Sequence, residues 1–299
     1  MFKENDDMRP AATPERVLAI CRLIEYGNGS YSTSDLYKLC ELEEHGEKNN
    51  EAIKDSIEAA IELEFVEKSG DKDKQNSDDT YKLKIDETNL ESADAFRKAV
   101  SSVVFNKKKS TFFLLTSWFI NHSDDVLGIS RFSDMAAKVA KAEDGIPSIS
   151  ENAILGWRFW MRFLGIAYQY NSRLFIPNKD SSKKQDKNKQ DNDVQYSSTL
   201  VQNMKTRLED AFELGKVPNN TRMTCTQFIS WIKANLPEAA EACTKASLPL
   251  ALSNGLRCLF MEKKIELIST RDAMRISLYP IEGIEPNDFS EIIIRRYGV

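Results

Sequence analysis

Hydrophobic and polar positions along the chain form a pattern that occurs three times: apolar residues at helical spacing, a stop, and then a run with a period of two. The clearest copy spans 150–177. Its apolar helical face consists of Ile154, Trp157, Met161 and Leu164. Ser150 precedes this face as a suitable N-cap, and Gly165 follows it as a residue that tolerates the positive φ of a helix end. The next residues predict two short strands with a turn at Asn171-Ser172.

The other two copies lie on either side of this one and have the same order of elements. For the first copy we expect helices that begin at Thr13-Pro14 and near Ser32, a helix over 50–63, and strands over 65–68 and 81–85. For the third we expect helices over 199–213, 226–235 and 248–261, a short strand over 222–224, and strands over 265–268 and 274–279. Further helices are expected over 92–105, 112–121 and 131–141.

A helix that runs into a tight two-stranded wing resembles the second half of a winged helix-turn-helix. The sequence therefore predicts an α+β fold that is mainly helical, with three tandem winged-helix domains and short two- or three-stranded wings. Residues 179–193 contain no large apolar residue, so we expect a flexible linker there. The expected parts are an acidic first domain at 1–90, a second domain with a lead-in helix at 91–178, the linker at 179–198, a third domain at 199–283 and a tail at 284–299.

Composition excludes several classes of protein. No apolar run reaches the roughly 18 residues of a transmembrane helix. The five cysteines are scattered without a CxxC pair, which argues against structural zinc and disulfides and favours a reducing cytoplasm. The sequence has no phosphate-binding glycine loop and no nucleophile with a recognisable base. We therefore expect no catalytic residue, no metal, no cofactor and no membrane contact, and the hypothesis is that the chain is not an enzyme.

Charge is unevenly distributed along the chain. Residues 1–90 hold 12 Lys and Arg against 22 Asp and Glu, whereas 91–180 hold 12 against 9. The third expected helix of the first domain carries Glu51, Asp55, Glu58 and Glu62. Carboxylates repel phosphates, so this helix is expected to face solvent or a protein partner rather than DNA.

The second domain carries the most promising nucleic-acid face. Arg158 and Arg162 lie four residues apart and so share one side of a helix, and aromatic residues flank them. Further candidates for contacts to the DNA backbone are Arg173, Lys107, Lys108, Lys109, Arg257, Arg271 and Arg275. An alternative stays open for each: the tryptophans beside the arginines would be core residues, and the basic residues would be part of a mixed-charge surface.

Two segments are similar to a narrower family. Ser117-Trp118-Phe119-Ile120 and the stretch from Trp160 to Pro177 resemble the DpdG family of bacterial gene clusters that insert 7-deazaguanine derivatives into DNA. The resemblance implies a cytoplasmic accessory protein of a DNA-modification and restriction system. It transfers no catalytic residue to this sequence.

Two functions follow as hypotheses. The first is a non-catalytic adaptor of a bacterial DNA-modification or antiviral defence system, which binds double-stranded DNA and recruits other protein subunits through its acidic first domain. The second is a structural tandem winged-helix subunit that binds protein rather than DNA, similar to the partners of kleisin subunits in chromosome-organising complexes.

Overall fold

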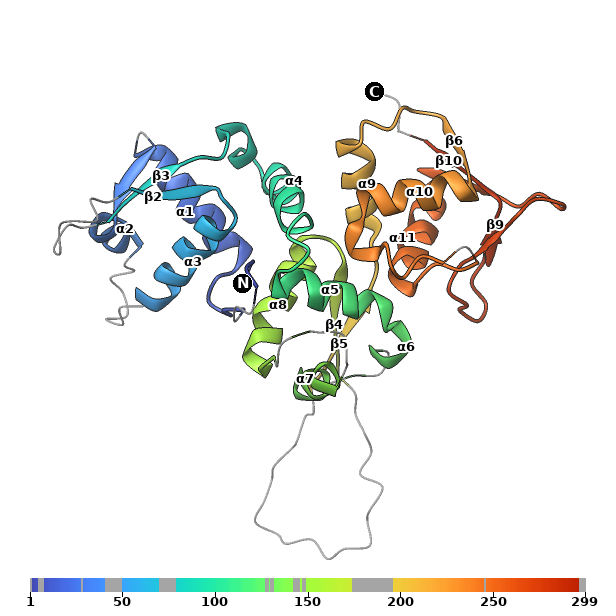
Figure 1. Ribbon diagram of the computed structural model, residues 1–299, viewed down its shortest axis with the longest axis horizontal. Helices are drawn as coiled ribbons and strands as arrows, with labels where there is room; N and C mark the ends of the chain where they lie inside the picture. Colours follow the sequence, from blue (N-terminus) through green and yellow to red (C-terminus); the bar gives the residue numbers. More distant parts are fainter. Residues whose placement is uncertain are drawn as a thin grey trace, which may run out of the picture.

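The computed structural model describes residues 2–4, 8–27, 29–40, 50–69, 79–126, 129, 132–141, 146, 149–173, 196–244 and 246–295. Its elements form three units that follow one another along the chain (Figure 1). We call them the N-terminal unit (14–90), the middle unit (93–202) and the C-terminal unit (205–295). The described residues among 2–12 precede the first helix and are called the arm. As the sequence predicts, the fold is α+β and mainly helical, with small antiparallel sheets.

The N-terminal unit follows the predicted order, with one strand added. Its elements are α1 (Pro14–Tyr26), β1 (Ser30–Ser32), α2 (Thr33–Cys40), α3 (Asn50–Glu62), β2 (Val66–Ser69), β3 (Thr80–Leu83) and the 3₁₀ helix Glu87–Leu90. Thr13 caps α1 by accepting a hydrogen bond from Arg16 N. The sheet has the order β1-β3-β2, so the last strand lies in the middle.

The middle unit is mostly helical. It contains α4 (Ala93–Val104), α5 (Thr111–Asn121), α6 (Ser123–Val126), α7 (Phe132–Lys141), α8 (Glu151–Phe163), β4 (Ala167–Arg173) and β5 (Tyr196–Gln202). The predicted turn at Asn171-Ser172 is wrong, because both residues lie inside β4 and pair with Ser198 and Ser197 of β5. The predicted helix start at 199 is wrong too. The alternating, partly β-branched residues before Gln202 suit a strand, and the next helix starts only at Lys205, whose amide nitrogen donates to Asn203 Oδ1.

The C-terminal unit also differs from the prediction in its strands. It contains α9 (Lys205–Leu214), β6 (Thr221–Thr224), α10 (Cys225–Asn235), the 3₁₀ helix Pro237–Ala239, α11 (Leu250–Met261), β7 (Ile265–Ile268), β8 (Ile276–Ser277), β9 (Asp288–Phe289) and β10 (Glu291–Ile294). The expected hairpin of 265–268 with 274–279 is wrong, because β7 pairs with β10, and β8 pairs with β9. The stretch that was expected to be a tail therefore supplies a strand of the sheet β6-β10-β7. Ile292 and Ile294 of β10 are buried, which explains the apolar triplet near the C-terminus.

The first and last units share one topology. In each, a helix, a strand and two further α-helices precede the remaining strands, and in each three-stranded sheet the strand that comes last in sequence lies between the other two. The C-terminal unit has β8 and β9 in addition, between β7 and β10 in sequence. The middle unit has instead the two-stranded sheet β4-β5 after its helices.

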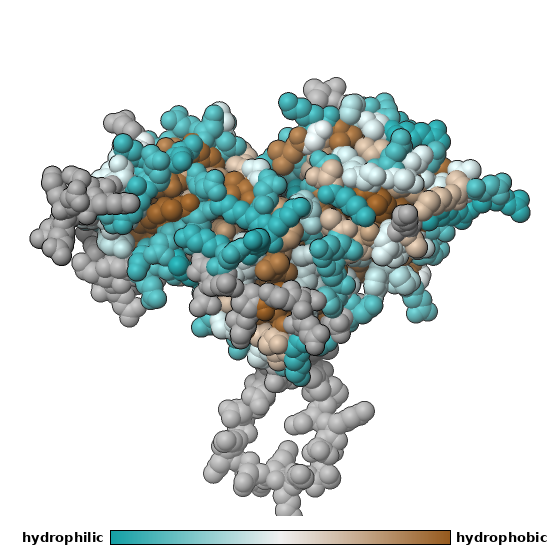
Figure 2. Space-filling view, viewed as in Figure 1, coloured by the Kyte–Doolittle hydropathy of each residue, from teal (hydrophilic) through white to brown (hydrophobic). Residues whose placement is uncertain are grey.

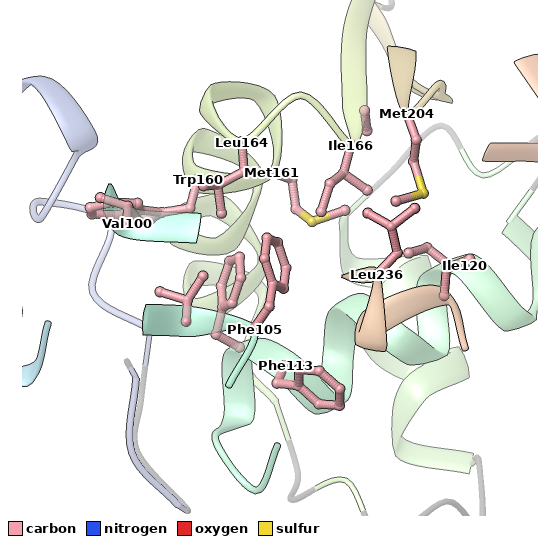
Figure 3. Close-up of a cluster of buried hydrophobic side chains, with 14 of the residues drawn as sticks. Val100, Phe105, Phe113, Ile120, Trp160, Met161, Leu164, Ile166, Met204 and Leu236 are labelled. Atoms are coloured by element: carbon pink, nitrogen blue, oxygen red, sulfur yellow. The ribbon is translucent and has the colours of Figure 1, made fainter. Parts of the chain in front are cut away.

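A single apolar core runs through all three units. Figure 3 shows buried side chains from α4, α5 and α8 beside Met204, which directly precedes α9, and Leu236, which directly follows α10. Phe96 of α4 contacts Phe65 of the N-terminal unit and Phe163 of α8, with ring centroids 5.6 and 5.9 Å apart. The units are therefore packed together rather than connected only by the chain.

Polar contacts reinforce the packing between the middle and C-terminal units. Arg207 of α9 is 3% exposed; its guanidinium lies 4.5 Å from the ring centroid of Phe105 and donates to Glu238 Oε1 at 2.8 Å. Glu238 lies in the 3₁₀ helix that packs on α5, and burial raises the pKa of its carboxyl group while Arg207 opposes the shift. Asn254 Nδ2 of α11 donates to the carbonyl oxygen of Gln202 at the end of β5, at 2.8 Å.

Candidate nucleic-acid interface

Helix α8 positions the two arginines on which the nucleic-acid prediction depends. Ser150 caps the helix through a hydrogen bond from Ala153 N to its Oγ at 3.0 Å. The two tryptophans beside the arginines point into the core: Trp157 Nε1 donates to Thr116 Oγ1 and Trp160 Nε1 to the carbonyl oxygen of Ala12. The alternative of core packing therefore holds for both, and neither can stack on a base.

The arm covers another side of α8. A Cβ atom on Gly156 would lie 3.0 Å from the carbonyl oxygen of Met8, so the glycine permits a close approach of the arm to the helix. Met8 itself is buried, and Phe2 packs edge-on against Phe112 and Trp160. What remains accessible on α8 is the strip that carries the arginines.

Arg158 is held between two aromatic rings. Its guanidinium carbon lies 4.9 Å from the ring centroid of Phe132 on α7 and 4.9 Å from that of Phe159 on its own helix. Its Nε is buried without a hydrogen-bond partner among the described residues, and burial lowers the pKa of the guanidinium. The group is still charged at neutral pH because an arginine pKa starts from above 12.

Arg162 completes this pair one turn further along the helix. It is exposed, and no ion pair involves it among the described residues. The two arginines therefore form a short positive strip next to two partly exposed phenylalanines. Such a strip can hold a phosphate and offers one aromatic face, which is a small footprint for a duplex.

The three lysines that precede α5 are mostly committed to carboxylates. Lys107 Nζ lies 2.7 Å from Glu64 Oε1, and it also donates to the carbonyl oxygen of Glu62. Lys109 Nζ lies 3.5 Å from Glu4 Oε1, and both side chains are largely exposed. Lys108 is exposed. These residues tie the arm and the N-terminal unit to the middle unit rather than form one basic patch.

The candidates in the C-terminal unit and in β4 are dispersed. Arg257 is 3% exposed and its Nε donates to the carbonyl oxygen of Pro286, so it cannot reach a DNA backbone in this fold. Arg275 directly precedes β8, and its Nη1 lies 3.4 Å from Oδ1 of Asp288 on β9. Arg271 is exposed nearby. Arg173 lies in β4, and its side chain is outside the described residues.

The acidic helix of the N-terminal unit is covered by the arm. Arg9 pairs with Glu58 and lies 3.8 Å from Asp55. Glu62 is 4% exposed, accepts a hydrogen bond from Phe2 N at 2.9 Å and lies 3.5 Å from Lys3 Nζ. Three of the four carboxylates that were expected to face solvent or a partner thus lie beside Lys3 or Arg9 of the same chain.

Other kinds of site are not found in the described part of the chain. Within it, no group of three or more His, Cys, Asp or Glu residues is placed to hold a metal ion. Among the same residues, no helix combines the length and the apolar character that crossing a membrane requires.

Sequence reasoning missed two determinants of this site. Phe132 stacks on Arg158 from a different helix, and the arm lies on α8 from about 150 residues away. Neither contact leaves a periodic signal, because each joins elements that are distant in sequence. The local hint was Gly156, a glycine in a helix interior, where the lack of a side chain permits the close contact with Met8.

Comparison with known proteins gives one match. The family model described as DpdG-like matches residues 8–237, which is more than three quarters of the chain. No curated protein and no solved structure matches the chain.

Proposed function

The chain belongs to the DpdG-like family, which points to a role in a DNA-modification system, and from this premise we propose that it is a non-catalytic accessory subunit that acts through protein contacts. In this role the packed units present a rigid surface to other subunits of the system. The proposal corresponds to the structural alternative of the sequence analysis rather than to the DNA-reading adaptor.

The element order supports two winged helices. Apart from the additional strands β8 and β9, the N-terminal and C-terminal units both have the order helix, strand, helix, helix, strand, strand, with the last strand in the middle of the three-stranded sheet. In a winged helix this order makes the third helix, here α3 and α11, the one that enters the major groove when the domain reads DNA.

One observation carries the proposal: these two helices together offer DNA a single accessible cation, Lys54. The only basic residue of α3 is Lys54, which lies 3.9 Å from Glu58 Oε1 on an otherwise acidic helix. The only basic residue of α11 is the buried Arg257, and eight of its twelve residues are buried. Because phosphate contacts dominate DNA affinity, two helices with one accessible cation between them are poor readers of DNA. Winged helices of this kind are better suited to packing against protein.

A second candidate function rests on α8. Arg158 is oriented by Phe132 and Phe159, and Arg162 is exposed beside it. An oriented guanidinium beside an aromatic ring can contact a phosphate and a base together. Under this alternative the middle unit binds DNA weakly and the outer units bind protein.

Duplex binding separates the two functions. The measurement is fluorescence anisotropy of a labelled duplex, titrated with the full chain at about 50 mM and about 200 mM salt. We expect no binding tighter than roughly 10⁻⁴ M at the lower salt concentration, which is the weak end of non-specific binding. In parallel, the tagged chain co-expressed with the other subunits of the system is expected to retain at least one of them through purification.

The variant Arg158→Glu with Arg162→Glu decides the second function. Binding tighter than roughly 10⁻⁴ M that falls with salt, and that the double variant loses with an unchanged circular dichroism spectrum, contradicts the protein-only proposal and assigns DNA to α8. Arg16→Glu with Lys38→Glu is the matched control, since it makes the same charge change at exposed positions of the N-terminal unit.

A further inference from the structure

Helix α1 has two faces, and only one of them is fully buried. Its buried face consists of Val17, Ile20, Cys21 and Ile24. The opposite face carries Leu18 and Leu23, both half-buried, and the exposed Ala19. Tyr26 ends the same face with 85% of its side-chain surface exposed. In Figure 2 hydrophobic surface is visible on the N-terminal unit where Figure 1 draws α1 and β2.

This outer face of α1 is the floor of a groove. The groove has a volume of about 620 Å³, and its other wall is formed by Ala93 at the start of α4 and Phe163 at the end of α8. Its floor consists of Pro14, Glu15, Leu18, Ala19, Arg22 and Leu23. At 1.5 Å per residue these positions extend over roughly 13 Å, enough for two to three turns of a helix laid along α1.

The floor residues are arranged symmetrically along the helix. Around the midpoint between Leu18 and Ala19, Glu15 is the mirror position of Arg22 and Pro14 is that of Leu23. A second α1 that runs antiparallel across a two-fold axis at this midpoint would place each residue opposite its mirror position. We propose that the outer face of α1 is a homodimer interface, in which Glu15 of each copy pairs with Arg22 of the other.

The charges at the two positions fit this pairing. Glu15 is exposed, and it forms no ion pair among the described residues. Arg22 is oriented by its own chain, because its Nε donates to the carbonyl oxygen of Leu90 at 2.8 Å and its Nη2 to that of Glu91 at 3.2 Å. The guanidinium keeps further donors for a carboxylate. The pairing occurs twice per dimer, once on each side of the axis.

The apolar residues fit the same geometry. Small Ala19 lies opposite Leu18 of the second copy at the centre, which allows the two helices to approach at the short end of the usual 8–10 Å between helix axes. Tyr26 of each copy reaches past Pro14 of the other toward the half-buried Ala11. The interface thus covers Tyr26, the aromatic residue of α1.

The dimer is expected to be weak. A pair of three-turn helices with its flanking groove walls buries an area at the low end of specific interfaces, which start at about 1,200 Å². A dissociation constant on the order of 10 μM follows for such a contact. The dimer does not depend on the proposed function, since it rests on the outer face of α1 alone.

Charge reversal tests the pairing directly. Sedimentation velocity of the full chain from about 1 to 100 μM is expected to show a monomer–dimer equilibrium in this range. Glu15→Arg and Arg22→Glu, each alone, replace two attractions by two repulsions and are expected to weaken the dimer at least tenfold. The double variant exchanges both charges and is expected to dimerise about as well as the natural chain.

Mixing the two single variants gives the sharpest result. One copy then carries two arginines and the other two glutamates at the mirror positions, so the mixture is expected to form a heterodimer although neither variant dimerises alone. Glu51→Arg is the matched control, because Glu51 is the exposed first-turn acid of α3 as Glu15 is of α1, and it is expected to leave the dimer unchanged.

Several outcomes would overturn the interface. If the natural chain remains monomeric at 100 μM, the outer face of α1 is not a homodimer interface and is available to a different partner protein. Dimers that persist in both single variants lie on another surface. If the mixture of single variants fails to associate, the antiparallel register is wrong, and thermal unfolding of each variant shows whether it is folded.

Discussion

Arg97 joins α4 to α9 through a two-point contact with Asp210. Its Nε lies 2.7 Å from Asp210 Oδ2 and its Nη2 lies 3.0 Å from Oδ1, and Asp210 is 2% exposed. The contact raises the pKa of Arg97 above its usual value. Removing one partner of a nearly buried, bidentate pair leaves the other charge uncompensated. We expect Asp210→Ala to lower the free energy of unfolding by about 3 kcal/mol, measured by urea denaturation.

The neighbouring pair on the same two helices is the control. Lys98 Nζ lies 2.7 Å from Glu213 Oε1, but the Glu213 side chain is 61% exposed. Solvent screens such a pair, so Glu213→Ala is expected to change stability by less than about 1 kcal/mol. Equal losses for the two variants would mean that burial does not strengthen the Arg97–Asp210 contact.

Single residues could be predicted from the sequence where their role is local. Ser150 caps α8, and Gly165 has φ +68° after it, both as expected from residue type. The role of Arg257 could not be predicted, because the carbonyl oxygen to which its Nε donates belongs to Pro286, 29 residues further along the chain. The ion pairs of Lys107 and Arg275 could not be predicted for the same reason, since their carboxylates belong to distant elements.

The arm is the element that sequence patterns underestimate most. It is short and has no helical or strand periodicity in sequence, yet Phe2 and Met8 are each 1% exposed. Phe2 contacts Phe112 and Trp160 of the middle unit while its amide nitrogen donates to Glu62 of the N-terminal unit. The arm therefore holds two units at once.

We expect Phe2→Ala to destabilise the protein by about 3 kcal/mol, because it empties a buried aromatic site. The environment of Trp160 should change with it, so the shift of tryptophan fluorescence during thermal unfolding is the measurement. Lys3→Ala is the control at the next position. The Lys3 side chain is 64% exposed and makes only a 3.5 Å contact with Glu62, and its loss is expected to be small. A cooperative transition at the same temperature in Phe2→Ala would contradict the role of the arm.

Helices and strands differ in how well the sequence predicts them. Helical periodicity located α1, α3, α4, α5, α7, α8, α10 and α11 to within a few residues, since their hydrogen bonds are local. The strands β5 and β10 were missed because their partners β4 and β7 lie more than 20 residues away, beyond the reach of turn chemistry. In both cases the sequence located the first strand of the pair correctly but assigned it the wrong partner strand.

The three units behave as one body at the scale of the whole molecule. In Figure 1, α4 stands between the N-terminal and C-terminal units, and ion pairs connect it to α9. A truncation at residue 90 would therefore remove Phe2, Met8 and Ala12 from the core of the middle unit. Experiments on isolated units would report exposed core surface rather than the function of a domain.

Cutting the chain between the middle and C-terminal units tests this unity. The stretch 179–193 lies outside the described residues, and its composition makes it the expected place of first proteolysis. We replace part of it by a specific protease site, cut the chain, and compare cut and uncut protein by size-exclusion chromatography. Because β4 and β5 pair over seven residues and the 3₁₀ helix Pro237–Ala239 packs on α5, the two fragments are expected to elute together at the volume of the uncut chain.

The contacts at this joint, between the middle and C-terminal units, also determine how the cut protein responds to salt and urea. The Arg97–Asp210 pair at this joint is nearly buried and the core is apolar, with Arg207 stacked on Phe105, so about 1 M salt should leave the fragments associated. Urea should separate them in the transition in which the units unfold, since neither fragment has a complete core. Two fragments that separate in native buffer and remain folded would instead establish independent domains on a tether, as the sequence pattern alone suggested.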